Sequence, residues 1–339
     1  MPKSGEQGTA KDEGEFGIIA RIFAPLATET GALGLRDDAA VLMFSEGHEL
    51  VVTCDTLVEG VHFLKDDPAD SVGHKALAVN LSDLTAKGAR GHAYLLSLAL
   101  PSDISTEWLE GFAAGLREIQ DKTGISLIGG DTTATPGPPT ITITALGLVA
   151  HQHAVLRLGA KPGDRLYVSG TIGDAYLGLR LLRAPALADD WGLSEGDVAF
   201  LVDCYRRPGP NNDLALLVRN FAQAAIDVSD GLIGDIEKLC QVSHVGAKIE
   251  TVRVPFSPAA KKALQRAPDL LPVLITAGDD YAVVVAVSET SGPGFESEAD
   301  AMGASFSLLG RVLPAGEGLS VVDGQGHALE LKHKGFRHF

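Results

Sequence analysis

Five short stretches of the sequence place aspartates beside small residues, and these are the side chains best suited to do chemistry. Many of these aspartates follow or interrupt an apolar run, where an unpaired carboxylate is costly to bury. Mg²⁺ prefers carboxylate, water and phosphate oxygens, and small neighbours let bulky phosphates approach the backbone. The pattern therefore indicates a site for divalent cations and phosphates. The stretches are "RDDAAVL" (36–42), "VTCDTLVEGVHF" (52–63), "NLSDL" (80–84), "GGDTT" (129–133) and "AIDVSDGLIGD" (225–235).

Each stretch taken alone also has an ordinary structural explanation. An aspartate before a helix is usually an N-cap, as Asp131 before two threonines could be, and Ser-Asp-Gly is a common turn former. Solvated turns explain the whole set poorly, because four of the five stretches coincide with core-strand patterns. We therefore expect the aspartates to lie at strand ends and to converge on one cleft.

Strand and helix patterns alternate along the chain and predict the elements that position these residues. In the first half, helix 105–124 has hydroxyl residues at its start and a glycine at its end, and helix 71–89 is less polar and expected to be packed on both sides. Strands are expected at 49–55, 93–101, 126–131 and 140–149. In the second half, strands are expected at "RLYVSG", "AAIDVSD", "YAVVVAV", "SLLGRVL" and "GLSVVD", with helices after residue 173 and near 231–243 and 257–267.

A loop with a Pro-Gly turn at 151–163 separates the two halves. We therefore predict a mixed α/β (α+β) protein of two domains joined near residue 152. The predicted parts are a flexible polar tail (1–14), an N-terminal domain (15–152) and a C-terminal α/β domain (153–339).

Composition restricts the classes of partner. The 339 residues are 45% hydrophobic and include 28 Lys and Arg against 44 Asp and Glu, a formal net charge of −16. An acidic chain argues against nucleic acid as a partner, and the longest apolar runs are strand-sized, which argues against a membrane span. Three widely spaced cysteines suggest neither a disulfide framework nor a zinc site, so a reduced cytoplasmic setting is expected.

Several familiar phosphate and hydrolase motifs are absent from the sequence. There is no GxxxxGK[ST] loop, no GxGxxG opening a βαβ unit and no HExxH helix. A P-loop and a dinucleotide-binding fold are therefore unsupported, and the glycines of "SGTIGDAYLG" (169–178) are weak evidence by themselves.

Taken in order, the motifs resemble the thiamine-monophosphate kinase family of the aminoimidazole-ribonucleotide-synthetase-like superfamily. "NLSDL", "GGDTT" and "GAKPGD" are typical of the superfamily, whereas "GEFGIIAR", "DTLVEGVHF" and "KGFRHF" are more specific to the family. The resemblance covers essentially the whole chain beyond the tail.

The resemblance implies ATP-dependent phosphorylation of thiamine monophosphate to thiamine diphosphate, with several Mg²⁺ ions and often K⁺. It also implies a homodimer that pairs the sheets of its N-terminal domains, and an active site formed between N- and C-terminal domains. Matching positions assign Mg²⁺ to Asp38 (with Asp37 as the alternative), Thr53, Cys54, Asp55, Asp83, Asp131, Asp227 and Asp230. They assign the nucleotide to Gly130, Asp131, Arg157 and Ser229, and thiamine phosphate to His62, Asp279 and Phe336.

Three positions depart from the family pattern. Cys54 stands where threonine is more common, Asp279 where glutamate is usual, and Arg36 where glycine is frequent. Without the resemblance, His62 is typical of a structural histidine, Arg157 of a surface arginine, Phe336 of a core anchor and Cys54 of a small buried residue. The resemblance implies no catalytic base, because the acceptor phosphate is already an anion and phosphoryl transfer depends on positioning and electrostatics.

Two alternatives remain open. Selenophosphate synthetase or a purine cyclo-ligase would use the same superfamily fold, but no cysteine precedes Cys54 and "DTLVEGVHF" is not typical of the cyclo-ligases. A non-catalytic Ca²⁺-binding protein would use the same aspartates, but no EF-hand loop is present. Dependence of metal binding on ATP would separate that class from a kinase.

Overall fold

A computed structural model describes residues 15–35, 39, 40, 42, 44 and 46–336, and it confirms a mixed α/β fold with two sheets. Contacts within the chain divide it into two compact units. Unit 1 comprises residues 1–84 and 91–151, and unit 2 comprises 85–90 and 152–339. The predicted domain limits, 15–152 and 153–339, stay a prediction, and each unit is described by itself below.

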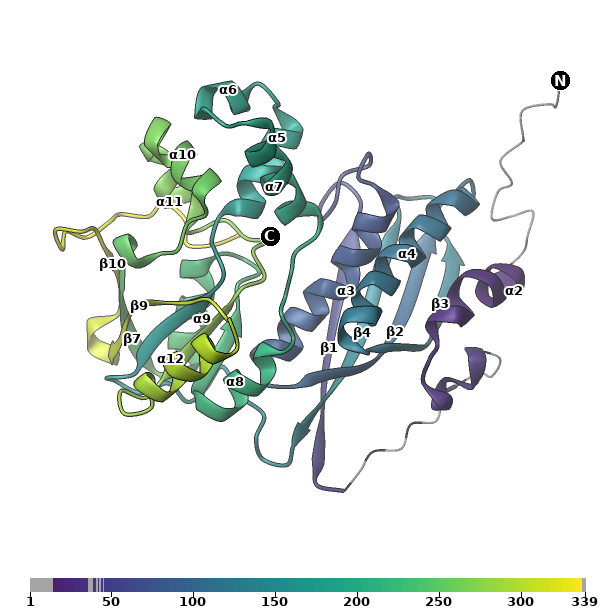
Figure 1. The fold of residues 1–339 in the computed structure, drawn as a ribbon, viewed down its shortest axis with the longest axis horizontal. Helices are drawn as coiled ribbons and strands as arrows, with labels where there is room; N and C mark the ends of the chain where they lie inside the picture. The colour runs from purple at the N-terminus through teal and green to yellow at the C-terminus, as the bar shows by residue number, and fades with distance from the viewer. Residues whose placement is uncertain (1–14, 36–38, 41, 43, 45, 337–339) are drawn as a thin grey trace. The chain divides into compact units, whose positions relative to one another are not determined.

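Unit 1 contains a four-stranded sheet in the order β1-β4-β2-β3 (Figure 1). Strands β1 and β4 pair antiparallel, and β2 and β3 pair parallel. All four strands expected in this part of the sequence are confirmed. Their bounds are β1 His48–Val58, β2 Arg90–Leu100, β3 Ser126–Ala134 and β4 Thr140–Ala150.

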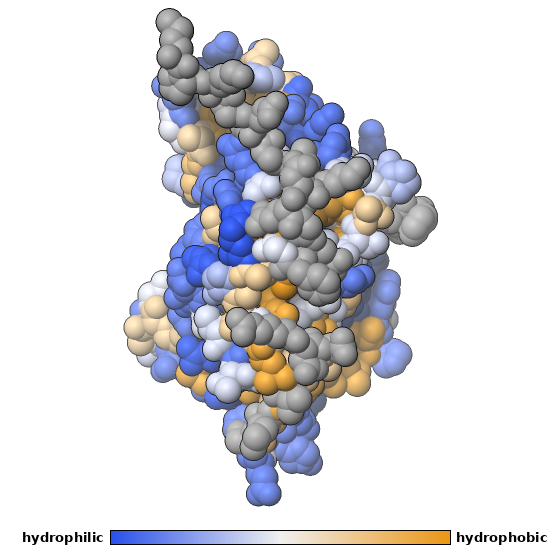
Figure 2. All heavy atoms as spheres, turned by 90° about the vertical axis from the view of Figure 1, so that its right-hand side faces the viewer, coloured by the Kyte–Doolittle hydropathy of each residue, from blue (hydrophilic) through white to orange (hydrophobic). Residues whose placement is uncertain are grey.

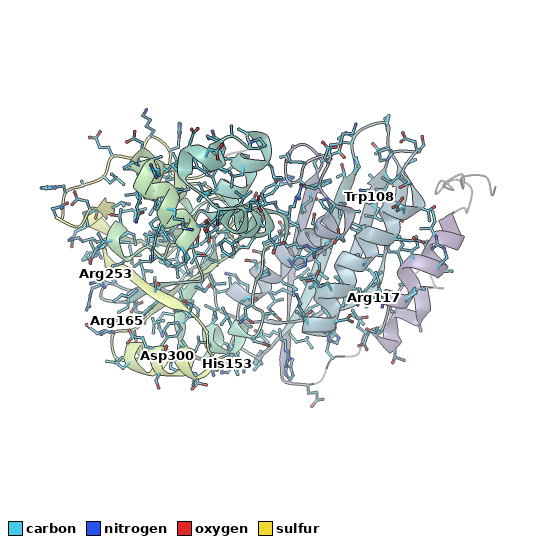
Figure 3. The ribbon with its side chains drawn as sticks, turned by 45° about the horizontal axis from the view of Figure 1, so that its top comes forward. Trp108, Arg117, His153, Arg165, Arg253 and Asp300 are labelled. Atoms are coloured by element: carbon cyan, nitrogen blue, oxygen red, sulfur yellow. The ribbon has the colours of Figure 1, made fainter. Side chains whose placement is uncertain are left out.

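Two long helices, α3 (Ala69–Ala86) and α4 (Thr106–Thr123), cover one face of this sheet (Figure 1). Ser105 caps α4 by accepting a hydrogen bond from the backbone N–H of Trp108, and Gly124 ends the helix in the left-handed conformation. Trp108, which is labelled in Figure 3, stacks on Phe112 one turn later, with ring centroids 5.3 Å apart. These features confirm the predicted amphipathic helix and its ends.

Helices α3 and α4 touch almost backbone to backbone. A Cβ atom added at Gly115 would lie 1.8 Å from the carbonyl oxygen of Asp70, and one added at Gly73 would lie 2.0 Å from that of Phe112. Glycine at both positions therefore permits the contact. Nearly every residue of α3 is buried, as expected from its low polarity.

Shorter helical turns precede the sheet in the chain. Gln120 of α4 links them to the unit, because its Nε2 donates to the carbonyl of Leu26 at 2.8 Å and its Oε1 accepts from Tyr94. The turns are α2 Glu15–Ile18, a π-helical turn Ile19–Phe23, and 3-10 turns Ala24–Leu26 and Thr30–Leu35.

Unit 2 is built on a six-stranded sheet in the order β10-β7-β9-β5-β8-β6. Strands β10 and β7 are parallel, and all other neighbours are antiparallel. Strand β7 was not expected from the sequence; the other five were. Their bounds are β5 Arg165–Ser169, β6 Ala222–Asp227, β7 Val245–Glu250, β8 Val283–Val287, β9 Phe306–Pro314 and β10 Leu319–Val322.

Both faces of this sheet are buried, which explains the continuous apolar run of β8. Val284 and Ala286 pack in one core with α9 (Leu232–Ser243), whereas Val283 and Val285 pack in another core with α8 (Leu214–Phe221) and α12 (Gly292–Ala301). The sheet therefore lies between two helical layers, and α9 carries the end of the stretch 225–235.

A third apolar core belongs to a group of helices in unit 2. They are α5 Asp174–Arg183, α6 Leu187–Trp191, α7 Glu195–Arg206, α10 Pro258–Arg266 and α11 Leu271–Leu274. Unit 2 also contains 3-10 turns at Thr251–Arg253, Pro268–Leu270 and Ala315–Glu317. Within the described part of the chain, none of the helices has the length and apolar character needed to span a membrane.

Candidate functional site

The first group of predicted ligands lies on the face of unit 1 that the helices cover. Successive side chains of a strand alternate between faces, so Thr53 and Asp55 of β1 share one face and Cys54 points to the other. Asp83, near the end of α3, meets Thr53 there, because the Thr53 hydroxyl donates to its Oδ2 at 2.5 Å. The structure thus brings Thr53, Asp55 and Asp83 to one face.

Cys54 lies on the opposite face of β1 and is exposed, so the expectation of a small buried residue is wrong. Its Sγ accepts a hydrogen bond from Thr144 of β4 at 3.4 Å. The thiol therefore cannot join Thr53 and Asp55, and only the backbone carbonyl of Cys54 remains available to a cation.

The expectation that the aspartates lie at strand ends is wrong for three of them. Asp55 lies inside β1, Asp131 lies inside β3, and Asp83 lies on a helix; Asp227 does end its strand, β6. Strand β1 lies at the edge of its sheet, and its side chains alternate between exposed and half-buried positions. Polar side chains are therefore tolerated in the middle of this strand. The sequence pattern therefore predicted the wrong positions for these residues in the elements, and their role as ligands stays a prediction.

Asp131 and Gly130 are exposed on β3, at the opposite edge of the sheet from β1. Three strand spacings separate the two edges, which is roughly 14 Å, so unit 1 by itself does not bring Asp131 to Asp55. Gly130 has φ +157°, and a Cβ there would lie 1.8 Å from the carbonyl oxygen of Leu96. Glycine is required at this position because β2 and β3 approach so closely.

His62 lies in the turn that follows β1. The backbone N–H of Val58 donates to its Nδ1 at 3.0 Å, so a neutral ring carries its proton on Nε2. The buried ammonium of Lys75 donates to the His62 carbonyl at 3.0 Å and fixes the turn. His62 is therefore a well-positioned, half-buried side chain that presents an N–H at Nε2.

The second group of predicted ligands lies in unit 2, at the end of β6. Asp227 is buried, and Ser229 and Asp230 are half-buried in the turn that leads into α9. Asp235 holds this turn: its Oδ2 accepts the backbone N–H of Asp230 at 3.0 Å and that of Gly231 at 3.1 Å. Burial raises the pKa of the Asp235 carboxyl above its ordinary value.

Lys238 connects the two aspartates of this turn. Its Nζ lies 2.5 Å from Asp230 Oδ2 and 2.7 Å from Asp235 Oδ1. Burial opposes the charge, but the hydrogen bonds that the ammonium donates to both carboxylates outweigh it and raise the pKa of Lys238. The sequence prediction missed this residue, although its i,i+3 spacing from Asp235 on a helix was a usable signal.

Asp279 is tied to the same turn. Its backbone N–H donates to the Ser229 carbonyl at 3.0 Å, and that of Tyr281 donates to Val228 at 2.8 Å. Asp279 and Tyr281 have φ values of 74° and 49°, which are rare for side-chain-bearing residues. Such backbone conformations cluster at functional sites.

Phe336 also reaches this turn from the end of the described chain. Its backbone N–H donates to the Asp230 carbonyl at 2.8 Å. The side chain is 54% exposed, so the alternative of a core anchor is wrong. Unit 2 therefore gathers four predicted residues from three distant segments: Ser229, Asp230, Asp279 and Phe336.

Among the described residues, Arg157 lies apart from these groups. Arg157 is exposed in the loop before β5, and its carbonyl accepts from the Ser243 hydroxyl at 2.9 Å. Its guanidinium makes no hydrogen bond to any residue that the structure describes. Asp37 and Asp38 lie outside the described residues.

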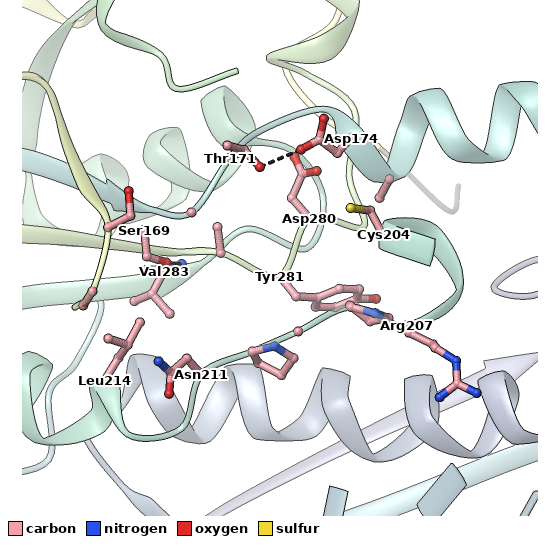
Figure 4. Close-up of a pocket in the computed structure, with 18 of the residues that line it drawn as sticks. Ser169, Thr171, Asp174, Cys204, Arg207, Asn211, Leu214, Asp280, Tyr281 and Val283 are labelled. Carbon is pink, nitrogen blue, oxygen red and sulfur yellow. Dashed lines mark hydrogen bonds between the residues drawn. The ribbon is translucent and has the colours of Figure 1, made fainter. Parts of the chain in front are cut away.

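A pocket of about 410 Å³ opens in unit 2, and Tyr281 is one of the residues that line it (Figure 4). Asp174 is buried and Asp280 is half-buried in its wall, and desolvation raises the pKa of both carboxyls. The Asp280 carboxylate accepts the backbone N–H of Gly173 at 2.8 Å, at the start of α5. Burial, followed by the charges of Asp174 and its neighbours, raises the pKa of Cys204 to about 12. The sequence prediction missed Asp280, although it adjoins Asp279.

The predicted ligands offer mainly oxygen donors, which limits the kind of metal ion that they suit. No group of three or more His, Cys, Asp or Glu is placed to hold a metal ion among the described residues. Mg²⁺ commonly binds to one or two carboxylates and completes its shell with water and phosphate oxygens. Thr53 and Asp83, which meet through a hydrogen bond and offer only oxygen donors, fit that requirement better than the needs of a softer metal.

The family comparisons match nearly the whole chain. Residues 36–149 match the AIR synthase related protein N-terminal domain, and residues 161–323 match the corresponding C-terminal domain. A curated thiamine-monophosphate kinase of Caulobacter vibrioides is 42% identical over 311 residues, covering 90% of this chain and 86% of the relative.

Two solved structures are similar in fold and sequence. Thiamine-monophosphate kinase from Stenotrophomonas maltophilia K279a has a TM-score of 0.78 and 37% identity, covering 87% of this chain and 91% of that one. The structure described as "AaThiL complexed with AMPPCP and TMP" has a TM-score of 0.76 and 29% identity, covering 97% and 98%.

Proposed function

This chain belongs to the thiamine-monophosphate kinase family of AIR synthase related proteins, and on that premise we propose that it transfers a phosphoryl group from ATP to thiamine monophosphate. The products are thiamine diphosphate and ADP. The observation that carries the proposal is 42% identity across 90% of the chain to a relative named as this kinase. The complex of a related protein with AMPPCP and TMP supports the same pair of substrates.

Mg²⁺ is the metal that the oxygen donors favour, and K⁺ is proposed in addition from the family resemblance. When bound, Mg²⁺ supplies positive charge that neutralises and aligns the phosphates. Cys54 serves through its backbone carbonyl, since its thiol points away. The proposed Mg²⁺ ligands are Asp38, Thr53, Cys54, Asp55, Asp83, Asp131, Asp227 and Asp230.

The remaining predicted residues bind and orient the two substrates. Gly130, Asp131, Arg157 and Ser229 are proposed to bind the nucleotide, and the guanidinium of Arg157 adds a positive charge suited to phosphate. His62 presents an N–H at Nε2, and Asp279 and Phe336 lie together on the turn of unit 2; these three are proposed to bind thiamine phosphate. No residue needs to act as a general base, because the acceptor phosphate is already ionised.

A homodimer is proposed through the second face of the unit 1 sheet. Leu50 and Val52 of β1 are exposed on that face, beside Leu148 and Leu146 of β4 in the register of the strands. Figure 2 shows hydrophobic side chains exposed among hydrophilic ones on the face that it turns toward the viewer. Exposed apolar patches of this kind often mark protein interfaces.

The cytoplasm is proposed as the location of the protein. All three cysteines are free thiols. Free thiols and widely spaced cysteines suit a reducing compartment.

The test of the proposed function is an acceptor comparison with purified protein, ATP and Mg²⁺. Thiamine monophosphate should give thiamine diphosphate and ADP in equal amounts by chromatography, and unphosphorylated thiamine should give neither. Addition of EDTA in excess of Mg²⁺ should abolish both products. Phosphorylation of thiamine, or no product from a folded protein that binds ATP, would overturn the proposal.

A further inference from the structure

Lys238 competes with any cation for a predicted metal ligand. Its ammonium lies 2.5 Å from Asp230 Oδ2. Asp230 is one of the proposed Mg²⁺ ligands, whereas Lys238 has no role in the proposed function. Because an ammonium donates a strong, charge-assisted hydrogen bond to the carboxylate, a divalent ion that uses this oxygen has to displace it.

The two aspartates that hold Lys238 differ in what they are able to do. Asp235 is 1% exposed, and its other oxygen already accepts two backbone N–H groups of the turn. It is therefore fixed and unable to reach a metal ion. The side chain of Asp230 is 34% exposed and that of Lys238 is 40% exposed, so both have room to change partners.

We propose that Lys238 is a positioning residue that holds Asp230 in the metal-free protein and releases it to a divalent cation while it stays paired with Asp235. The inference rests on the proposed function, because it requires Asp230 to be a metal ligand. As a consequence, Asp230 binds a free divalent ion more weakly than it would if the Lys238 ammonium were absent.

A purely structural role for Lys238 makes a different prediction. Lys238 also neutralises the buried carboxylate of Asp235, and removal of one partner of a buried pair destabilises a protein. A structural role would therefore lower the free energy of unfolding without strengthening metal binding. Metal affinity is the readout that separates the two roles.

The first experiment measures Mn²⁺ binding to the full-length protein by EPR in the absence of nucleotide. Lys238→Met should bind Mn²⁺ roughly threefold to tenfold more tightly than the wild type, since a partly exposed charge-assisted hydrogen bond is lost. Lys238→Arg keeps the cation and should bind like the wild type.

Lys334→Met is the matched control. The Lys334 ammonium pairs with Glu237 of the same helix at 2.6 Å and is 44% exposed. The substitution makes the same change in net charge but leaves the Asp230 pair intact. Its Mn²⁺ affinity should change by less than about twofold, because exposed charges are screened by salt.

If Lys238→Met fails to fold, the double variant Lys238→Met/Asp235→Asn still tests the proposal. It removes the cation and its buried anion together, so net charge is unchanged, and the asparagine still offers an oxygen to the turn. It should also bind Mn²⁺ more tightly than the wild type. Unchanged or weaker binding by the folded variants overturns the role of Lys238.

Asp230→Asn separates this inference from the proposed function. If it lowers Mn²⁺ binding while the Lys238 variants leave it unchanged, only the role of Lys238 is overturned. If Asp230→Asn has no effect on Mn²⁺ binding, Asp230 is not a metal ligand and both proposals fail at this residue.

Discussion

At the scale of single residues, the hydrogen bond between Thr53 and Asp83 orients a carboxylate that is proposed to bind Mg²⁺. The hydroxyl donates to one carboxylate oxygen at 2.5 Å, and the second oxygen is left for other partners. A hydrogen bond to a charged group contributes about 1.5–3 kcal/mol. Most of that contribution would be lost on removal of the hydroxyl.

Thr53→Val should therefore raise the Mg²⁺ concentration that gives half-maximal kinase activity by roughly tenfold. Steady-state assays over a range of Mg²⁺ concentrations measure the change. Thr56→Val is the control, because Thr56 lies on the same strand with its hydroxyl bonded to Thr142 on the opposite face. Equal effects of the two substitutions would contradict the assignment of Thr53.

The thiols of half-buried Cys204 and buried Cys240 provide a prediction about pH. Burial raises the pKa of Cys204 to about 12 and that of Cys240 to about 11. A raised folded-state pKa means that the stabilisation is complete below the unfolded value of 9.0 and is lost as pH rises through about 11 to 12. The native protein should therefore resist iodoacetamide at Cys204 and Cys240 at pH 8.

Peptide mapping by mass spectrometry measures this protection. In urea at pH 8 both cysteines should be alkylated, since the unfolded chain restores their ordinary pKa. Alkylation of native Cys204 at the unfolded rate would show that the wall of the pocket is open to solvent.

At the scale of elements, the pairing of β2 with β3 depends on Gly130. A side chain there requires a strained φ of +157° and collides with the Leu96 carbonyl oxygen. Gly130→Ala should lower the free energy of unfolding by about 1–3 kcal/mol and reduce activity, because Asp131 follows directly.

Urea unfolding and kinase assays measure both effects. Gly129→Ala is the control, since the nearest atom to its new Cβ is Cδ2 of the Leu95 side chain at 3.2 Å, which has freedom to move. Its loss of stability should be clearly smaller. The reverse order would contradict a close approach of the strands at Gly130.

Elements with a strong local pattern could be predicted from the sequence. Helix α4 has an apolar stripe, a Ser105 cap and a terminal Gly124, and β8 is a continuous apolar run. Strand β7 was missed because "VGAKIE" is short and contains glycine and lysine, which weaken a strand pattern. Its place in the sheet comes from pairing with β9 and β10, which no local pattern reveals.

For the candidate site too, the sequence indicated some features and could not indicate others. The composition of the stretches around Asp55, Asp83 and Asp230 made them candidates for the site. Their partners were not, because the contact of Thr53 with Asp83 spans 30 residues and joins a strand to a helix. The pair of Asp230 with Lys238 depends on how the turn enters α9, and the sequence does not specify that geometry.

At the scale of the whole molecule, the proposed dimer makes the exposed face of unit 1 an interface. Val52 is 55% exposed there. Val52→Glu would place a charge in the proposed interface, where it is costly to bury. The variant should be monomeric by sedimentation equilibrium, whereas the wild type should be dimeric.

Val252→Glu is the matched control in unit 2, where Val252 is 68% exposed. It should sediment like the wild type. A monomeric wild type, or dimers of both variants, would contradict an interface on this face of the sheet.

The most direct test of the central claim follows the phosphorus atoms by ³¹P NMR in a complete reaction. The account predicts that the γ-phosphate of ATP and the monoester of thiamine monophosphate disappear together. Two coupled resonances of a new diphosphate should replace them, one diphosphate for each ADP formed. Formation of ADP and inorganic phosphate, with the monoester unchanged, would contradict the account.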